Sequence, residues 1–75
     1  MVNVKEKELS KAIVGVIKSS DEPLETKEII AQLSEKIRGV TRVKILYRLM
    51  ILRGDGLVFG KSVGSGKGVW IWWTK

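Results

Sequence analysis

Two amphipathic segments joined by a short glycine-containing link most constrain how this chain can fold. Apolar side chains recur at spacings of three and four through residues 26–37, and again through residues 41–53. Such spacing places them along one side of an α-helix. The link Arg38-Gly39-Val40 is a short turn, so the two helices are predicted to form a helix-turn-helix arrangement.

Capping residues define the predicted helix boundaries. We expect a first helix over residues 5–19, whose apolar face runs through residues 9–17. Thr26 is the expected N-cap of the second helix and Thr41 that of the third, since a hydroxyl can accept a bond from a free backbone N–H. Gly39 and Gly54 follow the ends of these helices, where glycine is the preferred residue.

The third helix is expected to have one apolar face and one solvent face. At about 100° per residue, its core-facing arc is predicted to hold Val43, Ile45, Leu46, Leu49, Met50 and Leu52. The opposite arc is predicted to hold Lys44, Tyr47, Arg48 and Ile51. Arg42 and Arg53 fall within the apolar arc at the helix ends, where their long stems can carry the charge outward.

The end of the chain is expected to form a β-hairpin. Residues 57–62 and 69–74 are rich in β-branched and aromatic residues, which is typical of strands, and a glycine-rich loop at 63–68 joins them. Leu24-Glu25 is too short for an independent strand but can add one short rung to the sheet. The 75 residues are therefore predicted to form a single α+β domain, a three-helix bundle followed by a hairpin.

Three tryptophans occur within four residues of the last strand. Because side chains alternate along a strand, Trp70 and Trp72 point one way and Trp73 the other, with Val69 and Ile71. One set must pack on the helices, and the sequence leaves open which one. The exposed set either covers the sheet as aromatic surface, stacks on unpaired bases or forms a protein interface.

The positive charge is concentrated in the second half of the chain. Residues 38–75 contain eight Lys and Arg residues against Asp55 alone, a net charge of +7, whereas residues 1–37 have a net charge of −1. No acid lies between Glu35 and Asp55. A cationic half predicts a polyanionic partner, and nucleic acid is the usual one. A solvated basic surface is the alternative.

The candidate nucleic-acid contacts lie on the third helix and in the hairpin loop. Arg and Lys can contact guanine edges or phosphates, and a hydroxyl or a free helical N–H can bind phosphate. The helix candidates are Thr41, Arg42, Lys44, Tyr47 and Arg48. The loop is cationic and rich in glycine, so it can lie along a nucleic-acid backbone. Its candidates are Lys61, Ser65 and Lys67.

On these elements the chain resembles the winged-helix family of DNA-binding domains, from about Lys5 to Lys75. Residues 26–30 are similar to the start of that family's support helix, and residues 41–52 to its recognition helix. The run Arg53-Gly54-Asp55-Gly56-Leu57-Val58 is similar to the step with which the family enters its wing. The resemblance implies a small transcriptional regulator that binds duplex DNA, with the third helix in the major groove and the 61–68 wing on the backbone.

Catalytic and metal-binding functions have little support in the sequence. The chain has no Cys and no His, so it lacks thiolate ligands, disulfides and the commonest general base. We expect no enzyme activity, metal or cofactor. Gly64-Ser65-Gly66-Lys67 resembles part of a nucleotide-binding P-loop, but Lys61 and Gly68 stand where that motif needs Gly and Ser or Thr. No apolar segment is long enough to span a membrane, and we expect a cytoplasmic protein.

The leading alternative function is a protein-interaction module. In that interpretation Trp70, Trp72 and Trp73 dock a partner protein through the last strand. A homodimer is also compatible with the sequence, with its seam on residues 9–17 or on the tryptophan strand. Ile51 is an ordinary exposed residue, a thymine-methyl contact or part of such a seam.

Overall fold

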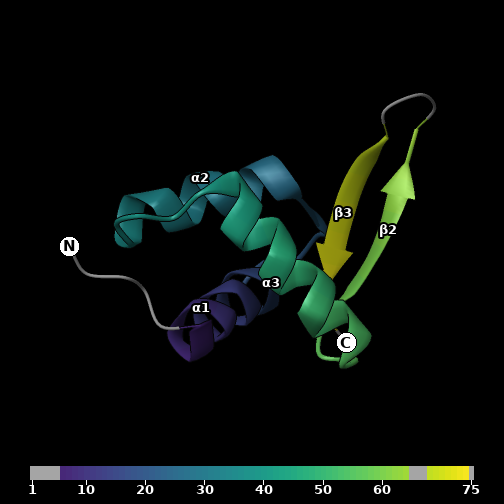
Figure 1. Cartoon of the computed structure of the whole chain (residues 1–75). Helices are drawn as coiled ribbons and strands as arrows, with labels where there is room; N and C mark the ends of the chain where they lie inside the picture. Colours follow the sequence, from purple (N-terminus) through teal and green to yellow (C-terminus); the bar gives the residue numbers. More distant parts are fainter. Residues whose placement is uncertain (1–5, 65–67, 75) are drawn as a thin grey trace.

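Three helices and a three-stranded antiparallel sheet make up the part of the chain that the computed structural model describes, residues 6–64 and 68–74. The helices are α1 (Glu6–Lys18), α2 (Thr26–Lys36) and α3 (Arg42–Gly54). The strands are β1 (Leu24–Glu25), β2 (Phe59–Val63) and β3 (Val69–Trp73). The helices lie together, and the β2–β3 hairpin projects beside them (Figure 1). The expected α+β class and order of elements are confirmed, including the short strand at Leu24.

The apolar sides of the three helices meet one face of the sheet in a single core. The buried apolar residues are Leu9, Ile13, Val16, Ile17, Leu24, Ile29, Leu33, Ile45, Leu49, Leu52, Val58 and Trp72. The first four of these form the apolar face of α1. Because this face is buried within the domain, its side chains cannot also form the dimer seam considered for residues 9–17.

The turn between α2 and α3 has the predicted N-cap, but both helices end differently from the prediction. The C-cap of α2 is Ile37, so Gly39 lies within the turn. Gly54 is the last residue of α3, whose C-cap is Asp55. Gly39 has a φ of +79°, in the left-handed region that glycine adopts without strain. Thr41 is the N-cap of α3, and its Oγ1 accepts a hydrogen bond of 3.2 Å from the backbone N–H of Lys44. The Lys44 Nζ donates to the Gly39 carbonyl oxygen at 3.3 Å. These bonds fix the start of α3 relative to the turn.

The predicted start of α2 is wrong by one residue. Glu25, not Thr26, is the N-cap, and its backbone N–H donates to the Glu28 Oε1 at 2.8 Å. Thr26 is the first helical residue and is buried. Its hydroxyl accepts a hydrogen bond of 2.9 Å from the Trp72 Nε1, so the side chain binds the sheet instead of the helix end.

The first hairpin strand begins later than predicted. The strand starts at Phe59, whereas residues 57 and 58 carry the chain around the end of α3. The backbone N–H groups of Leu57 and Val58 donate to the Leu52 carbonyl oxygen, at 2.9 and 3.5 Å. Val58 is fully buried, because this path turns its side chain into the core.

The sheet has the order β1-β3-β2, which places β3 at its centre. Leu24 and Gly60 both pair with Trp72, from opposite sides of β3. Trp72 is fully buried, and Trp70 is half-buried and packs against the core. The helix-facing side of β3 is therefore the one that carries Trp70 and Trp72, which answers the question that alternation alone left open.

Gly60 provides the space that Trp72 occupies. A Cβ built on Gly60 would lie 2.5 Å from the Trp72 Cζ3, closer than real Cβ atoms approach another atom. We expect Gly60→Ala to lower the melting temperature by about 4–24 °C, since overpacking costs about 1–3 kcal/mol. Gly15→Ala is the matched control, because a Cβ there meets nothing within 4 Å and alanine favours helix. Thermal unfolding in which both variants are equally stable would contradict the close packing.

Candidate nucleic-acid interface

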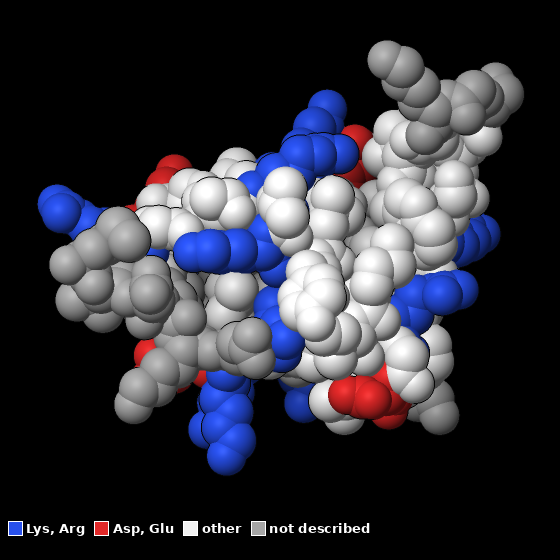
Figure 2. Space-filling view, in the orientation of Figure 1, with Lys and Arg blue, Asp and Glu red and all other residues white. Residues whose placement is uncertain are grey.

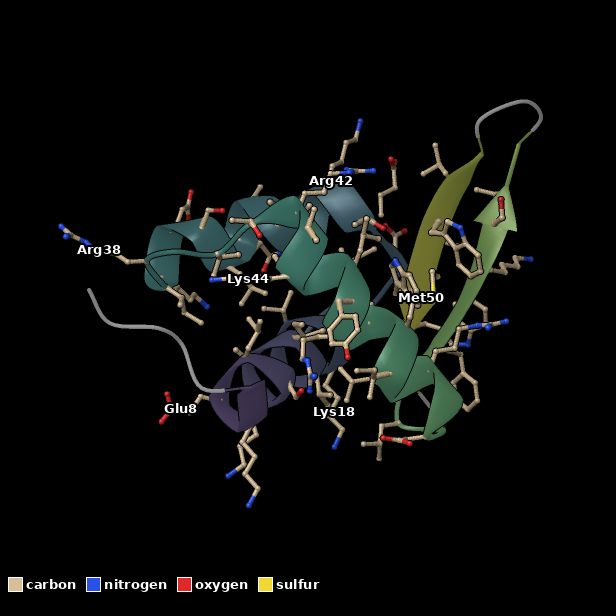
Figure 3. The ribbon with its side chains drawn as sticks, in the orientation of Figure 1. Glu8, Lys18, Arg38, Arg42, Lys44 and Met50 are labelled. Atoms are coloured by element: carbon tan, nitrogen blue, oxygen red, sulfur yellow. The ribbon has the colours of Figure 1, made fainter. Side chains whose placement is uncertain are left out.

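The N-terminal half of α3 brings together most of the helix residues predicted to contact nucleic acid. Thr41, Arg42, Lys44 and Tyr47 are all exposed. Arg42 and Lys44 extend to different sides of the helix, and Lys44 points toward the α2–α3 turn (Figure 3). Arg38, exposed in that turn, adds a further cation beyond the end of α2. No residue of α3 is acidic.

The predicted apolar arc of α3 is too broad. Ile45, Leu49 and Leu52 are buried, but Val43 is 77% exposed and Met50 is 42% exposed. The three buried residues follow one line along the helix, with spacings of four and three. The core covers this narrow stripe of α3 and not the whole predicted arc. The sequence could not separate the two groups, because both have the spacing of an amphipathic helix.

Two residues of the predicted solvent face lie partly inside the structure. Arg48 and Ile51 are half-buried. The Arg48 guanidinium carbon is 5.2 Å from the centre of the Tyr47 ring, within cation–π range. Arg48 therefore lies against Tyr47 and is less exposed than predicted for the solvent face of the helix.

Arg53 joins the end of α3 to the hairpin. Its Nε donates to the Gly60 carbonyl oxygen at 3.1 Å, and its guanidinium carbon lies 5.3 Å from the Trp70 ring centre. The side chain thus holds the hairpin against α3. The sequence placed this arginine correctly at a helix end but gave no indication of its partner.

Lys27 is a candidate that the charge distribution missed. It is exposed at the start of α2 and lines a hollow of about 370 Å³ between α3 and β3, together with Arg42, Met50 and Trp70. Its Nζ lies 3.8 Å from the Glu25 Oε1 with both side chains exposed, which makes the ion pair weak. Lys27 belongs to the half of the sequence with almost no net charge, so the comparison of halves did not single it out.

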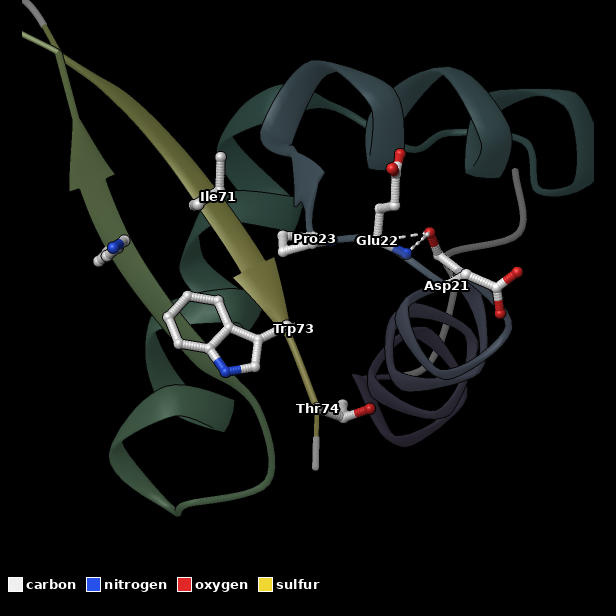
Figure 4. Close-up of a pocket in the computed structure, with 8 residues that line it drawn as sticks. Asp21, Glu22, Pro23, Ile71, Trp73 and Thr74 are labelled. Atoms are coloured by element: carbon white, nitrogen blue, oxygen red, sulfur yellow. Dashed lines mark hydrogen bonds between the residues drawn. The ribbon is translucent and has the colours of Figure 1, made fainter.

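The hairpin candidates are not all beside α3. Lys61 lies within β2 and pairs with Ile71, so it is on the face of the sheet opposite Trp70 and Trp72. It lines a separate hollow of about 390 Å³ with Ile71 and Trp73. The carboxylates of Asp21 and Glu22, at the rim, point away from the indole (Figure 4). Ser65 and Lys67 lie outside the described residues.

Seen from the side on which α3 lies in front, residues other than Asp, Glu, Lys and Arg occupy much of the middle of the surface (Figure 2). Lys and Arg side chains lie around them, and Asp and Glu side chains appear at a few places nearer the edge. The exposed α3 residues Val43, Tyr47 and Met50 contribute to this uncharged region. The arrangement is suited to a polyanion that has an uncharged surface between two lines of charge.

No protein-family model matches the chain, and comparisons with curated proteins and with solved structures also give no match. Within residues 6–64 and 68–74, no three His, Cys, Asp or Glu residues are grouped closely enough to hold a metal ion. None of the helices in that same part of the chain combines the length and apolar character needed to cross a membrane.

Proposed function

We propose that this protein is a winged-helix domain that binds duplex DNA and acts as a small transcriptional regulator. The observation that carries the proposal is the exposed, acid-free surface of α3, on which Arg42, Lys44 and Tyr47 lie close to the helix start. A fold of this class serves several functions, so the proposal depends on this surface and not on the arrangement of helices and strands.

In the proposed complex α3 enters the major groove, whose width of about 12 Å accommodates an α-helix. The free N–H groups at the start of α3 and the Thr41 hydroxyl face a phosphate. Lys27 and Arg38, from the two ends of α2, extend the cationic surface along the DNA backbone. The backbone contact predicted for the 61–68 wing remains part of the proposal, but Lys61 takes no part in it, because it lies in β2 on the outer face of the sheet.

Binding is expected to depend steeply on salt. If about four to six phosphates are neutralised, the logarithm of the association constant should fall with the logarithm of salt concentration with a slope of roughly −4 to −5. Fluorescence anisotropy with a mixed-sequence duplex at several salt concentrations measures this slope. The absence of binding at low salt would remove the proposed function.

A protein interface on the outer face of the sheet is the second candidate. From the sequence, a protein interface could involve Trp70, Trp72 and Trp73. Because Trp70 and Trp72 face the helices, Trp73 is the tryptophan of β3 that remains for an interface on the outer face. Trp73 and Phe59 lie on the outer face, are half-buried, and stack with ring centres 6.1 Å apart. Ile71 and the 45% exposed Val69 extend this apolar face, which is suited to a second copy of the chain.

Sedimentation equilibrium tests the second candidate. If two copies associate through the outer face, Trp73→Ala should convert a dimer into a monomer and leave the fold intact, because aromatic residues dominate the energy of such contacts. Val43→Ala, which shortens an exposed side chain on α3, is the control and should leave the dimer unchanged. A parent protein that is monomeric at every concentration would argue against self-association.

A further inference from the structure

The exposed side of α3 carries a second apolar stripe, which the proposed function alone does not explain. Val43, Tyr47 and Met50 follow spacings of four and three along the helix and are all exposed. We refer to these three side chains as the exposed ridge. The buried stripe has the same spacings about half a turn away and consists of Ile45, Leu49 and Leu52.

Cations lie on both flanks of the exposed ridge. Arg42 and Lys44 are the neighbours of Val43 in the chain, so they leave the helix about 100° to either side of it. Both are exposed, and Figure 3 shows them extending to different sides of α3. With no acid on the helix, the surface is an uncharged ridge between positively charged flanks.

The major groove has the complementary pattern of an uncharged floor between two phosphate backbones. Of the groups on that floor, the thymine C5-methyl is the apolar one, and the others are hydrogen-bond donors and acceptors. Valine has no hydrogen-bonding group, the methionine sulfur is a weak acceptor, and Tyr47 has a single hydroxyl. A ridge of this kind therefore gains most from methyl groups.

We propose that the exposed ridge of Val43, Tyr47 and Met50 contacts thymine methyl groups, so that the protein prefers thymine-containing duplex. This inference rests on the proposed function, and it assigns base recognition to the ridge instead of to the cations of α3. The cations on its flanks then contact phosphates and hold the helix in the groove. An apolar ridge can also dock a protein, but the exposed cations Arg42 and Lys44, on a helix without acids, favour the nucleic acid.

The removal of the methyl groups alone tests this inference. Deoxyuridine lacks only the C5-methyl of thymidine, so a short alternating A·T duplex is compared with the same duplex containing uracil at every thymine. We expect the thymine duplex to bind more tightly, by about fourfold for each methyl group buried. In the opposite direction, methylation of cytosine at C5 in an alternating G·C duplex places a methyl in the same groove and should increase affinity.

Ridge variants locate the contact on α3. Val43→Gln with Met50→Gln should bring the affinities for the thymine and uracil duplexes to within about twofold of each other, because the polar side chains lose the apolar contact. Leu57→Gln is the control, since Leu57 is 58% exposed outside α3 and should leave the difference unchanged. Exposed positions are chosen so that all variants fold, which circular dichroism verifies.

The outcomes separate the inference from the function on which it rests. Salt-dependent binding that is equal for thymine and uracil duplexes would overturn the inference and leave duplex binding in place. A thymine preference that is undiminished in the ridge double variant would also overturn it, because Val43 and Met50 would then contribute nothing to the contact. No binding to any duplex would remove both the inference and the proposed function.

Discussion

Trp72→Ala is expected to destabilise the domain so strongly that most molecules are unfolded. Truncation of a buried tryptophan costs about 3–5 kcal/mol, and this one also satisfies the buried Thr26 hydroxyl through its Nε1. A domain of this size has little stability to lose, so the melting temperature should fall by at least about 12 °C. Trp72→Phe keeps most of the packing and loses the hydrogen bond, so its stability should lie between that of the parent protein and that of Trp72→Ala.

Trp73→Ala is the matched control for this prediction. Trp73 is in the same strand but on the outer face of the sheet, where it is half-buried. Its truncation should reduce stability by clearly less than that of Trp72. Differential scanning calorimetry of the three variants provides the comparison. Equal losses for Trp72→Ala and Trp73→Ala would show that the assignment of the two faces of β3 is wrong.

Replacement of both Arg42 and Lys44 by alanine should produce the largest loss of DNA affinity. Each phosphate contact that is lost should weaken binding to every sequence, and the two cations lie on opposite flanks of the exposed ridge, so the effects of the two replacements should add. Because both are taken here as phosphate contacts, the loss should be similar for all duplex sequences and the salt slope should become shallower by about 2.

The control for this pair is Lys18→Ala. Lys18 is exposed at the end of α1, so the net charge changes without any change to α3. If Lys18→Ala lowers DNA affinity only slightly, and equally for all duplexes, then the position of a cation on the surface matters in addition to the total charge. If Lys18→Ala weakened binding as much as either α3 replacement, the charged surface would act without a defined interface.

The sequence predicted the elements well because the signals for them are local. Gly39 in the turn and Thr41 as the cap of α3 depend on residues within a few positions. The short strand at Leu24 was also anticipated. The start of α2 was not, because Thr26 is a good N-cap by type and only its contact with Trp72, far along the chain, explains its buried position.

The two faces of β3 and of α3 could not be assigned from the sequence, for related reasons. Alternation divides the β3 residues into two sets without saying which set meets the helices. Gly60 was the available signal, since a glycine within a strand often marks close approach by another group, here Trp72. On α3, apolar residues recur at helical spacing on two sides of the helix. The periodicity therefore predicted one wide apolar arc, whereas the structure has a buried stripe and a separate exposed ridge.

Chemical-shift mapping with duplex DNA tests the central claim most directly. We expect the largest changes of backbone amide shifts at Thr41, Val43 and Tyr47, with smaller changes at Lys27, and all of them should diminish as salt increases. The outer face of the sheet, at Phe59 and Ile71, should remain unchanged. Shifts confined to that outer face, or no shifts at low salt, would contradict the account of α3 as a DNA-binding helix.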